Sequence, residues 1–382
     1  MGDVFRELIG QHQAVATLRR ALEGRSHAMT HAWLFVGPPG SGRSNAAKAF
    51  AAALVCPDGG CGGCVVCRTA LSGAHPDVAL LRTEKLSIGV EEVRSLVVRA
   101  NASPVSGPYQ VVVIEDADRI TERGADALLK GLEEPAPRTV WLLCAPSPDD
   151  VIVTIRSRCR TIRLVTPSDE AVAELLADRD GVAPALAAYA ARVAQGHVGR
   201  ARVLARSEEA RIRRREILAL PGRLTSVTAC LDAADNLVKS ALDEAIQVTA
   251  DLDAKELASL REMLGVGGRG AKPRNAPAAI RDLEEQQKAR VKRLQRDALD
   301  RVLTEFTAYY RDVLATQTAP SVPLVNADLV DEIGPLARRS TPEATLRALD
   351  SILAARTALD GNVAPLLALE ALLIGLSQAG RS

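Results

Sequence analysis

The segment that most constrains the fold is an apolar run that ends in a glycine-rich loop and continues into a helix-forming stretch. The run covers residues 32–36 (AWLFV), the loop covers residues 37–44 (GPPGSGRS), and the stretch extends to residue 54. Glycines let the loop turn its N–H groups toward one point, and the first turn of a helix adds a partial positive charge that favours an anion. We therefore expect a phosphate-binding loop. Its predicted contact residues are Gly37, Gly40, Gly42, Arg43 and Ser44.

Arg43 occupies the position at which this loop pattern requires a lysine. Lysine offers a compact point charge to the β and γ phosphates of a nucleotide, whereas arginine is a longer planar fork and is not an equivalent replacement. Ser44 retains the hydroxyl that can bind Mg²⁺. The loop therefore predicts weak or altered binding of a nucleotide, and the sequence leaves the binding of ATP and Mg²⁺ open.

A second apolar run, residues 111–114, ends in the acidic pair Glu115-Asp116. In ATPases with such a loop the order is Asp-Glu, where the Asp supports Mg²⁺ and the Glu activates water. The reversed order displaces each carboxylate by one C–C bond, about 1.5 Å, and a misplacement of about 1 Å can lower a rate about a hundredfold. Two interpretations stay open: a degenerate nucleotide site that includes Glu115 and Asp116, or acids that only solvate the end of a strand.

The first part of the chain alternates strand-like and helix-like segments. Residues 32–36, 111–114 and 140–144 are short, continuous apolar runs, as expected for strands that are buried on both faces of a parallel sheet. Helix-like stretches, such as residues 44–54 and 126–132, lie between them. The pattern predicts an α/β domain with a parallel sheet.

Beyond Pro167 the sequence contains no further strand-like run. Residues from about 168 to 208 predict two or three short amphipathic helices, and the chain from about residue 210 onward is helical and rich in alanine and leucine. Three domains are therefore expected. They cover residues 1–167 (α/β), 168–208 (a small helical domain) and 209–382 (all-α).

Composition restricts the possible functions. The chain has 382 residues, of which 47% are hydrophobic, enough for a sizeable core in two or three domains. Its formal net charge of +1 gives no overall basic field for nucleic acid, and its 3% aromatic content argues against a platform that stacks single-stranded bases. No apolar stretch of about 18 residues occurs and the first residues are polar, so we expect a cytoplasmic protein that does not enter a membrane.

Four of the seven cysteines lie close together, with the spacing Cys56-x₄-Cys61-x₂-Cys64-x₂-Cys67. Glycines between the first three let the chain wrap tightly. Four thiolates that leave no open coordination position suit a structural, tetrahedral Zn²⁺ site. An iron–sulfur cluster and disulfide bonds are the alternatives.

One glycine-rich, basic stretch, residues 265–275, interrupts the helical second half of the chain. Its composition predicts a flexible loop. The loop precedes a highly charged helix, residues 282–301, whose wide polar face is expected to be solvated. A loop that contacts DNA is the alternative interpretation.

Segments along almost the whole chain resemble the clamp-loader subunits of bacterial DNA polymerase III, which belong to the AAA+ family. Residues 127–135 (ALLKGLEEP) resemble the family's segment after the acidic motif, and residues 155–159 (IRSRC) carry its Ser-Arg-Cys signature. Residues 7–11 (ELIGQ) resemble the motif on the adenine side of the nucleotide, and residues 362–370 (NVAPLLALE) resemble the last collar helix. The resemblance implies an α/β ATPase domain with a zinc module, a helical lid, and a C-terminal collar that joins a five-subunit ring.

Departures from the family pattern imply that the chain's own ATP site is inactive. Besides Arg43 and the Glu115-Asp116 pair, the sensor position after the fourth strand falls at residues 145–146 (AP), which offer no side chain for a hydrogen bond to a γ-phosphate. The lid motif, usually Gly-x-x-Arg, reads GHVG at residues 196–199 and lacks its arginine. Four altered elements resemble the family's non-hydrolysing δ′ type, so little or no ATPase activity is expected.

Arg158 is the residue to which the resemblance assigns a catalytic role. In this family the arginine of Ser-Arg-Cys projects into the ATP site of the adjacent subunit, and an arginine that acts in trans can be worth about 10³ to 10⁵ in rate. A salt bridge within its own domain is the alternative role. The implied partners are γ/τ and δ subunits in the ring and, through the complex, the sliding clamp and primer–template DNA.

The favoured function is therefore a ring subunit that helps to load the sliding clamp as part of the polymerase III holoenzyme. Two other functions stay open. An active ATP-hydrolysing subunit of the γ/τ type would have to tolerate the substitutions. A zinc-dependent DNA-binding module would bind DNA in a salt-sensitive manner, and the near-neutral charge argues against it.

Overall fold

The structure is a computed structural model that divides into two compact units. The first unit comprises residues 1–207 and the second unit residues 208–382. The stretch 265–275, expected to be a loop, lies outside the described residues. In the part of the chain that is described, no helix is both long and apolar enough to cross a bilayer. The described residues are 3–24, 28–83, 87–264 and 276–379.

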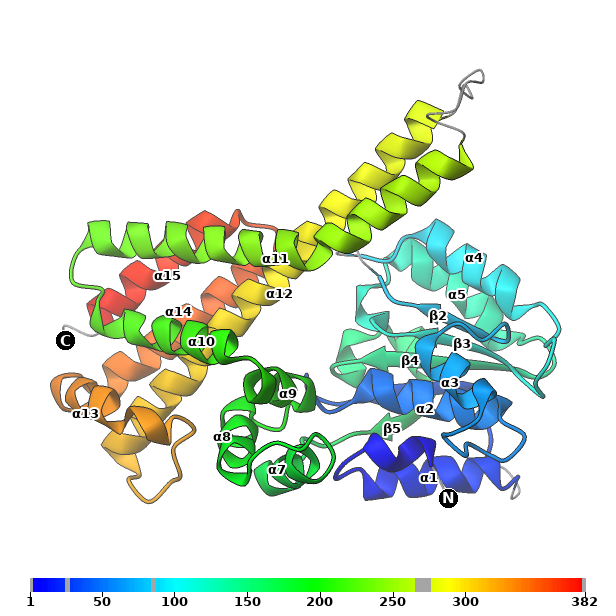
Figure 1. Cartoon of the computed structure of the whole chain (residues 1–382), viewed down its shortest axis with the longest axis horizontal. Helices are drawn as coiled ribbons and strands as arrows, with labels where there is room; N and C mark the ends of the chain where they lie inside the picture. The colour runs from blue at the N-terminus through cyan, green and yellow to red at the C-terminus, as the bar shows by residue number, and fades with distance from the viewer. Residues whose placement is uncertain (1–2, 25–27, 84–86, 265–275, 380–382) are drawn as a thin grey trace. The chain divides into compact units, whose positions relative to one another are not determined.

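A five-stranded parallel sheet organises the first unit, with the strand order β2-β3-β4-β1-β5 (Figure 1). The three predicted strands are confirmed and form the centre of the sheet. The two edge strands were not predicted, because each has four residues and β5 reads Arg-Thr-Ile-Arg with one buried side chain. The strands are β1 (Ala32–Val36), β2 (Val78–Leu81), β3 (Gln110–Ile114), β4 (Thr139–Ala145) and β5 (Arg160–Arg163).

Helices cover both faces of the sheet, because successive side chains of each strand point to opposite faces. Trp33 and Phe35 of β1 pack with Phe50 of α2 in one core cluster, whereas Leu34 belongs to the cluster on the other face. The helices of the first face are α1 (His12–Leu22), α2 (Arg43–Val55) and α3 (Val65–Ser72). Those of the second face are α4 (Val90–Ala100), α5 (Glu122–Glu133) and α6 (Val153–Arg156).

Three short helices complete the first unit and match the helices predicted between residues 168 and 208. Ser168 caps the first of them, since its hydroxyl accepts the N–H of Ala171 at 3.2 Å. The second ends where Gln195 and Gly196 adopt left-handed conformations, with φ of +50° and +80°, and the chain reverses direction there. The helices are α7 (Asp169–Asp178), α8 (Pro184–Ala194) and α9 (Val198–Arg206).

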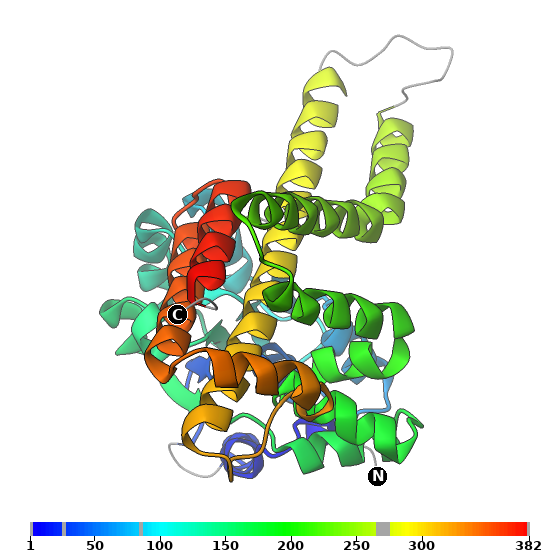
Figure 2. The same ribbon diagram turned by 90° about the vertical axis from the view of Figure 1, so that its left-hand side faces the viewer.

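The second unit is helical throughout its described part, as predicted. Its two longest helices, α11 (Val227–Met263) and α12 (Ala276–Thr318), lie side by side (Figures 1 and 2). Phe306 of α12 and Leu369 of α15 are fully buried members of its core. The remaining helices are α10 (Glu208–Ala219), α13 (Val330–Arg339), α14 (Pro342–Asp360) and α15 (Pro365–Ala379).

The charged face of α12 is less solvated than the sequence predicts. Arg290, within the predicted charged helix, is only 9% exposed. Its guanidinium donates to Asp253 at 2.7 Å and to Glu256 at 2.9 Å, both on α11. The hydrogen bond from Arg290 also lowers the pKa of the Glu256 carboxyl. Part of this polar face therefore joins the two long helices, which single-helix periodicity does not reveal.

A buried polar network connects α10, α12 and the segment that follows α12. Arg214 of α10 donates to Glu305 of α12 at 3.0 Å and to the side-chain oxygen of Asn326. The carboxylate of Asp312 accepts the backbone N–H of Asn326 at 2.6 Å and its side-chain N–H at 2.8 Å. All four side chains are nearly inaccessible to solvent, so each polar group depends on the others for its hydrogen bonds.

Candidate functional site

The predicted phosphate loop connects β1 to α2 and lines a cavity of about 240 Å³. Gly40 and Gly42 both adopt left-handed conformations, which glycine enters without a steric penalty. The structure brings four of the five predicted loop residues to this cavity; Gly37 is not part of its lining, and its N–H donates to the Pro146 carbonyl at 3.2 Å. Other lining residues include Glu7, Leu8, Ile9, Pro167, His197, Val198, Gly199 and Arg202.

Arg43 is turned onto its own loop. Its guanidinium donates a hydrogen bond to the carbonyl oxygen of Gly37. Ser41 in the same loop is 3% exposed, and its hydroxyl has no hydrogen-bond partner among the described residues. The cation that takes the place of the usual lysine is therefore partly engaged by the protein itself, while a buried hydroxyl beside the cavity lacks a partner.

The acidic pair lies at the carboxyl end of β3 and does not contribute to the lining of that cavity. Lys48 of α2 places its Nζ 2.9 Å from Oε1 of Glu115, and Arg82 places its Nε 3.8 Å from Oε2. Asp116 precedes a short 3-10 helix, residues 117–119. Burial and the neighbouring charge of Asp116 raise the pKa of the Asp118 carboxyl. The two predicted acids are thus brought near the loop by the sheet, and Glu115 already has cations beside both of its oxygens.

His197 at the start of α9 lies directly against the loop. A Cβ built on Gly40 would be 2.5 Å from Cγ of His197, a distance at which neither group fits. The Nδ1 atom of His197 accepts the N–H of Arg200 at 3.2 Å, which caps the helix. Burial and the charges of Arg200 and Arg43 lower the pKa of His197 below its usual value of 6.5. The absence of a side chain at Gly40 is therefore what lets His197 lie against the loop.

Arg202 is a pocket residue that the sequence reasoning missed. It lines the cavity together with Gly199, the position at which the sequence pattern lacks its expected arginine. Its Nε donates to Asp180 at 2.8 Å, and its Nη1 lies 3.9 Å from Glu7. The available signal was its spacing, since a residue three positions after Gly199 lies on the same helix face one turn later.

Arg158 follows α6 and is about one third exposed, with a side-chain accessibility of 36%. It forms an ion pair with Glu133 of α5 and donates to the Thr154 carbonyl at 2.7 Å. The salt bridge within its own domain, which was the alternative role for this arginine, is thus present in the single chain. A pair that is this exposed contributes about 1 kcal/mol at most, so Arg158 can exchange its partner at low cost.

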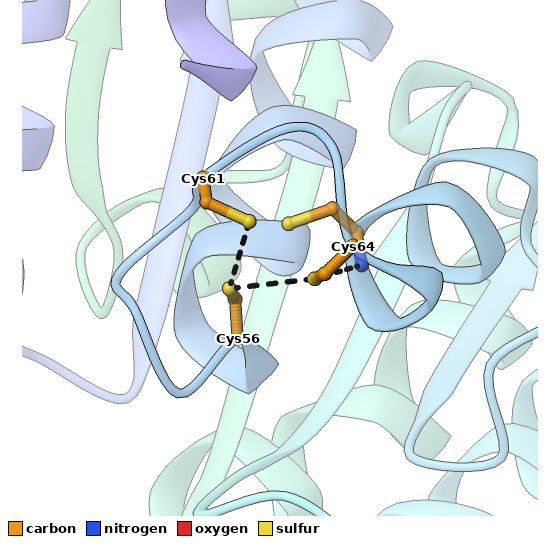
Figure 3. A group of neighbouring side chains, drawn as sticks. Cys56, Cys61 and Cys64 are labelled. Atoms are coloured by element: carbon orange, nitrogen blue, oxygen red, sulfur yellow. Dashed lines mark hydrogen bonds between the residues drawn. The ribbon is translucent and has the colours of Figure 1, made fainter. Parts of the chain in front are cut away.

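The four clustered cysteines converge on one point between α2 and α3. Their Sγ atoms all lie within 4.8 Å of one another. Figure 3 shows Cys56 with the sulfurs of Cys61 and Cys64 directed toward it, at 4.0 and 3.8 Å. Tetrahedral Zn–S bonds of about 2.3 Å require sulfur–sulfur distances of about 3.8 Å. The residues therefore fit a zinc ion, and Cys67 supplies the fourth ligand atom.

The electrostatic surroundings of these thiols differ from one another. Burial raises the pKa of Cys56, but backbone N–H donors of Cys61, Gly60 and Asp58 outweigh it and lower this pKa to about 7. Burial raises the pKa of Cys67. The N–H of Cys67 donates to Sγ of Cys64 at 3.3 Å, so the start of α3 also holds one sulfur in place. A zinc ion would stabilise all four thiolates together.

Comparisons with known proteins cover the first unit most strongly. Residues 10–168 match the family model described as DNA polymerase III, delta subunit. The chain is 38% identical to the DNA polymerase III subunit delta′ of Yersinia pestis over 161 residues, 41% of this chain and 44% of that protein. It is 31% identical to the subunit delta′ of Bacillus subtilis over 195 residues, 50% of this chain and 59% of that protein.

A subunit of the other type is also similar. The DNA polymerase III subunit tau of Bacillus subtilis is 25% identical over 330 residues, which are 83% of this chain and 51% of that protein. The chain thus spans about half the length of the relatives that it matches. The chain is therefore similar to subunits of DNA polymerase III, and both delta′ and gamma/tau subunits are among these relatives.

Proposed function

We propose that this chain is a δ′-type subunit of a clamp-loader ring, which supplies Arg158 to the ATP site of a neighbour and does not hydrolyse ATP itself. The observation that carries the proposal is the contrast between two arginines. Arg43, in the position of the catalytic lysine, is bonded to its own loop carbonyl, whereas Arg158 of the Ser-Arg-Cys signature is exposed and weakly paired.

The proposed partners are the other clamp-loader subunits, of the γ/τ and δ types, in a five-subunit ring. Through this ring the chain would act on the sliding clamp and on primer–template DNA. Residues 168–208 would serve as the lid and residues 209–382 as the collar. The cysteine module would hold a structural Zn²⁺, because its four ligands leave no position for a substrate.

The role of Arg158 is tested by Arg158→Ala in a reconstituted loader. We expect ATP turnover at the adjacent site to fall about a thousandfold in single-turnover hydrolysis, since a charge-stabilising arginine is removed. Ring assembly, measured by size-exclusion chromatography, should be unchanged, because the exposed pair with Glu133 contributes little stability.

Arg156→Ala is the matched control for this test. Arg156 is the last residue of α6, two positions before Arg158; it has a similar side-chain exposure of 35% and forms an ion pair with Asp149. Its removal should leave turnover within about twofold of the unaltered loader. Equal loss of turnover in both variants, or no loss in Arg158→Ala, would remove Arg158 from the catalytic role.

A second candidate function is an ATP-hydrolysing subunit of the γ/τ type. It is supported by the similarity to the tau subunit, which extends over 83% of this chain. Mg²⁺-dependent ATP turnover by the isolated chain distinguishes the two functions. Turnover that disappears in Glu115→Gln or Asp116→Asn would favour the γ/τ type and contradict the δ′ proposal.

A further inference from the structure

In this chain a lysine reaches the acid beside which a P-loop protein holds its divalent cation. Such a cation lies between the hydroxyl that ends the loop and the first acid of the strand, which are Ser44 and Glu115 here. Lys48 follows Ser44 by four residues in α2 and therefore lies on the same face of that helix. Its ammonium group reaches Glu115 at 2.9 Å. One side chain thus lies on the Ser44 face of α2 and extends to the acid.

The surroundings of this contact favour a resident cation. The Glu115 side chain is 9% exposed and that of Lys48 is 23% exposed, so water screens the pair only weakly. Among the described residues, no donor is aligned for a hydrogen bond to Oε1 of Glu115. The negative charge of this oxygen is therefore balanced mainly by the nearby charge of Lys48. Arg82 lies 3.8 Å from the other oxygen. A buried carboxylate needs such compensation, and removing the partner would be strongly unfavourable.

The remaining charges near the loop do not restore a site for a divalent ion. Mg²⁺ requires oxygen ligands in nearly octahedral geometry and retains part of its water shell. Two more carboxylates, Asp116 and Asp118, lie near the loop, and the positive charge of Arg43 acts on Asp118. Lys48 lies against Glu115 and the charge of Arg43 acts on Asp118, so a Mg²⁺ ion would meet electrostatic repulsion, to which the largely exposed Arg82 adds less.

We propose that the Lys48 ammonium replaces the divalent cation at Glu115, so that no Mg²⁺ is held there and the phosphate loop binds any polyphosphate independently of a metal. The residues therefore do not fit the magnesium ion that the phosphate loop would otherwise imply. The proposal adds a physical cause to the lack of hydrolysis, because water activation and charge neutralisation in such sites depend on that ion.

This inference does not rest on Arg158 acting in trans. The proposed function is wrong if Arg158→Ala leaves ATP turnover of the reconstituted loader unchanged. The Lys48 inference is tested by measuring metal binding directly, on the isolated, zinc-loaded full chain. The two can therefore be judged separately.

The test uses Mn²⁺ as a probe, titrated alone and with ADP and followed by electron paramagnetic resonance of the free ion. The unaltered chain and Lys48→Arg, which keeps the positive charge, should have no Mn²⁺ site that depends on Glu115. Lys48→Met should gain one, with at least about tenfold tighter Mn²⁺ binding. Adding Glu115→Gln to Lys48→Met should abolish the gain. Lys130→Met, which removes an exposed lysine of α5, is the matched control and should match the unaltered chain.

Two results would overturn the proposal. One is a Mn²⁺ site in the unaltered chain that Glu115→Gln removes, a measurement that requires no change at Lys48 and so holds even if Lys48→Met fails to fold. The other is a folded Lys48→Met variant without any gain in Mn²⁺ affinity, since Lys48 would then not be what excludes the metal. Unfolding curves of each variant establish that it is folded before the titration.

Discussion

Gly40 and Gly42 share a backbone conformation but differ in what surrounds them. Their φ angles are +86° and +89°, so either would strain an alanine to a similar extent. A Cβ on Gly40 would meet the His197 ring at 2.5 Å, whereas a Cβ on Gly42 would have nothing within 4 Å. Alanine at the two positions therefore separates the free-energy cost of the left-handed backbone from the cost of displacing His197.

We expect Gly40→Ala to destabilise the first unit more than Gly42→Ala does. Both variants carry a left-handed alanine, which costs about 1–2 kcal/mol. Gly40→Ala adds overpacking against His197, which costs about a further 1–3 kcal/mol. Urea unfolding followed by tryptophan fluorescence measures this difference, because both tryptophans, Trp33 and Trp141, are buried in the sheet of the first unit.

Equal destabilisation by the two alanines would contradict the packing of His197 on the loop. Gly40→Ala combined with His197→Gly provides the matching control, because the new methyl group would lie 2.5 Å from Cγ and 2.6 Å from Cβ of His197, and only glycine removes both atoms. The double variant should lower the cost of Gly40→Ala without reaching that of Gly42→Ala, since the Cα of residue 197 remains 2.7 Å away.

At the scale of elements, the segment between α2 and α3 is held by its sulfurs rather than by regular structure. Gly60 lies so close to the N-terminal segment that a Cβ there would be 2.7 Å from Cγ2 of Val4. The N–H of Val4 donates to the Gly60 carbonyl at 3.1 Å. A metal in this module would therefore fix the α2–α3 connection and, through Gly60, the start of the chain.

Cys61→Ser tests the module. We expect the purified chain to hold about one zinc per molecule and the variant to hold far less, because one of four thiolate ligands is lost. The thermal midpoint followed by tryptophan fluorescence should fall, since binding of the metal contributes to folding. Cys159→Ser is the control, because Cys159 lies outside the cluster and should keep its zinc content. Iron in place of zinc in elemental analysis would contradict the assignment.

At the scale of the whole molecule, each unit has its own hydrophobic core, and the second unit adds a buried polar network to its core. Arg214 and Glu305 form an ion pair with side-chain exposures of 4% and 7%, and the arginine also donates to the side-chain oxygen of Asn326. Neighbouring Arg213 pairs with Glu244 but is 49% exposed. Two adjacent arginines of α10 thus form one buried ion pair and one exposed ion pair.

Arg214→Ala should lower the free energy of unfolding of the second unit by about 3–5 kcal/mol, because it removes the guanidinium that forms an ion pair with the buried Glu305 carboxylate. Arg213→Ala should cost less than about 1 kcal/mol. Helix loss in urea, measured by far-ultraviolet circular dichroism, reports the second unit through its long helices. A similar small effect of both variants would mean that water reaches the network and solvates Glu305.

Much of the fold was predictable from the sequence for local reasons. The central strands are continuous apolar runs, and the phosphate loop and the cysteine module are defined by spacing within a dozen residues. The edge strand β5 was not predictable, since its charged residues are tolerated only because the strand lies at an edge. The contacts of Arg290 were missed because its partners lie on a different helix.

The sequence by itself determined the α/β character of the first unit, the close spacing of the four cysteines and the position of Arg158, because these depend on residue identity and short spacing. Only the tertiary structure decided which cation compensates Glu115, what lies against Gly40, and which arginine of α9 reaches the cavity. Lys48, His197 and Arg202 come from segments far from their partners in the chain. The packing of α2 and α9 in the first unit brings these residues to their partners, and a local sequence pattern does not predict contacts between distant segments.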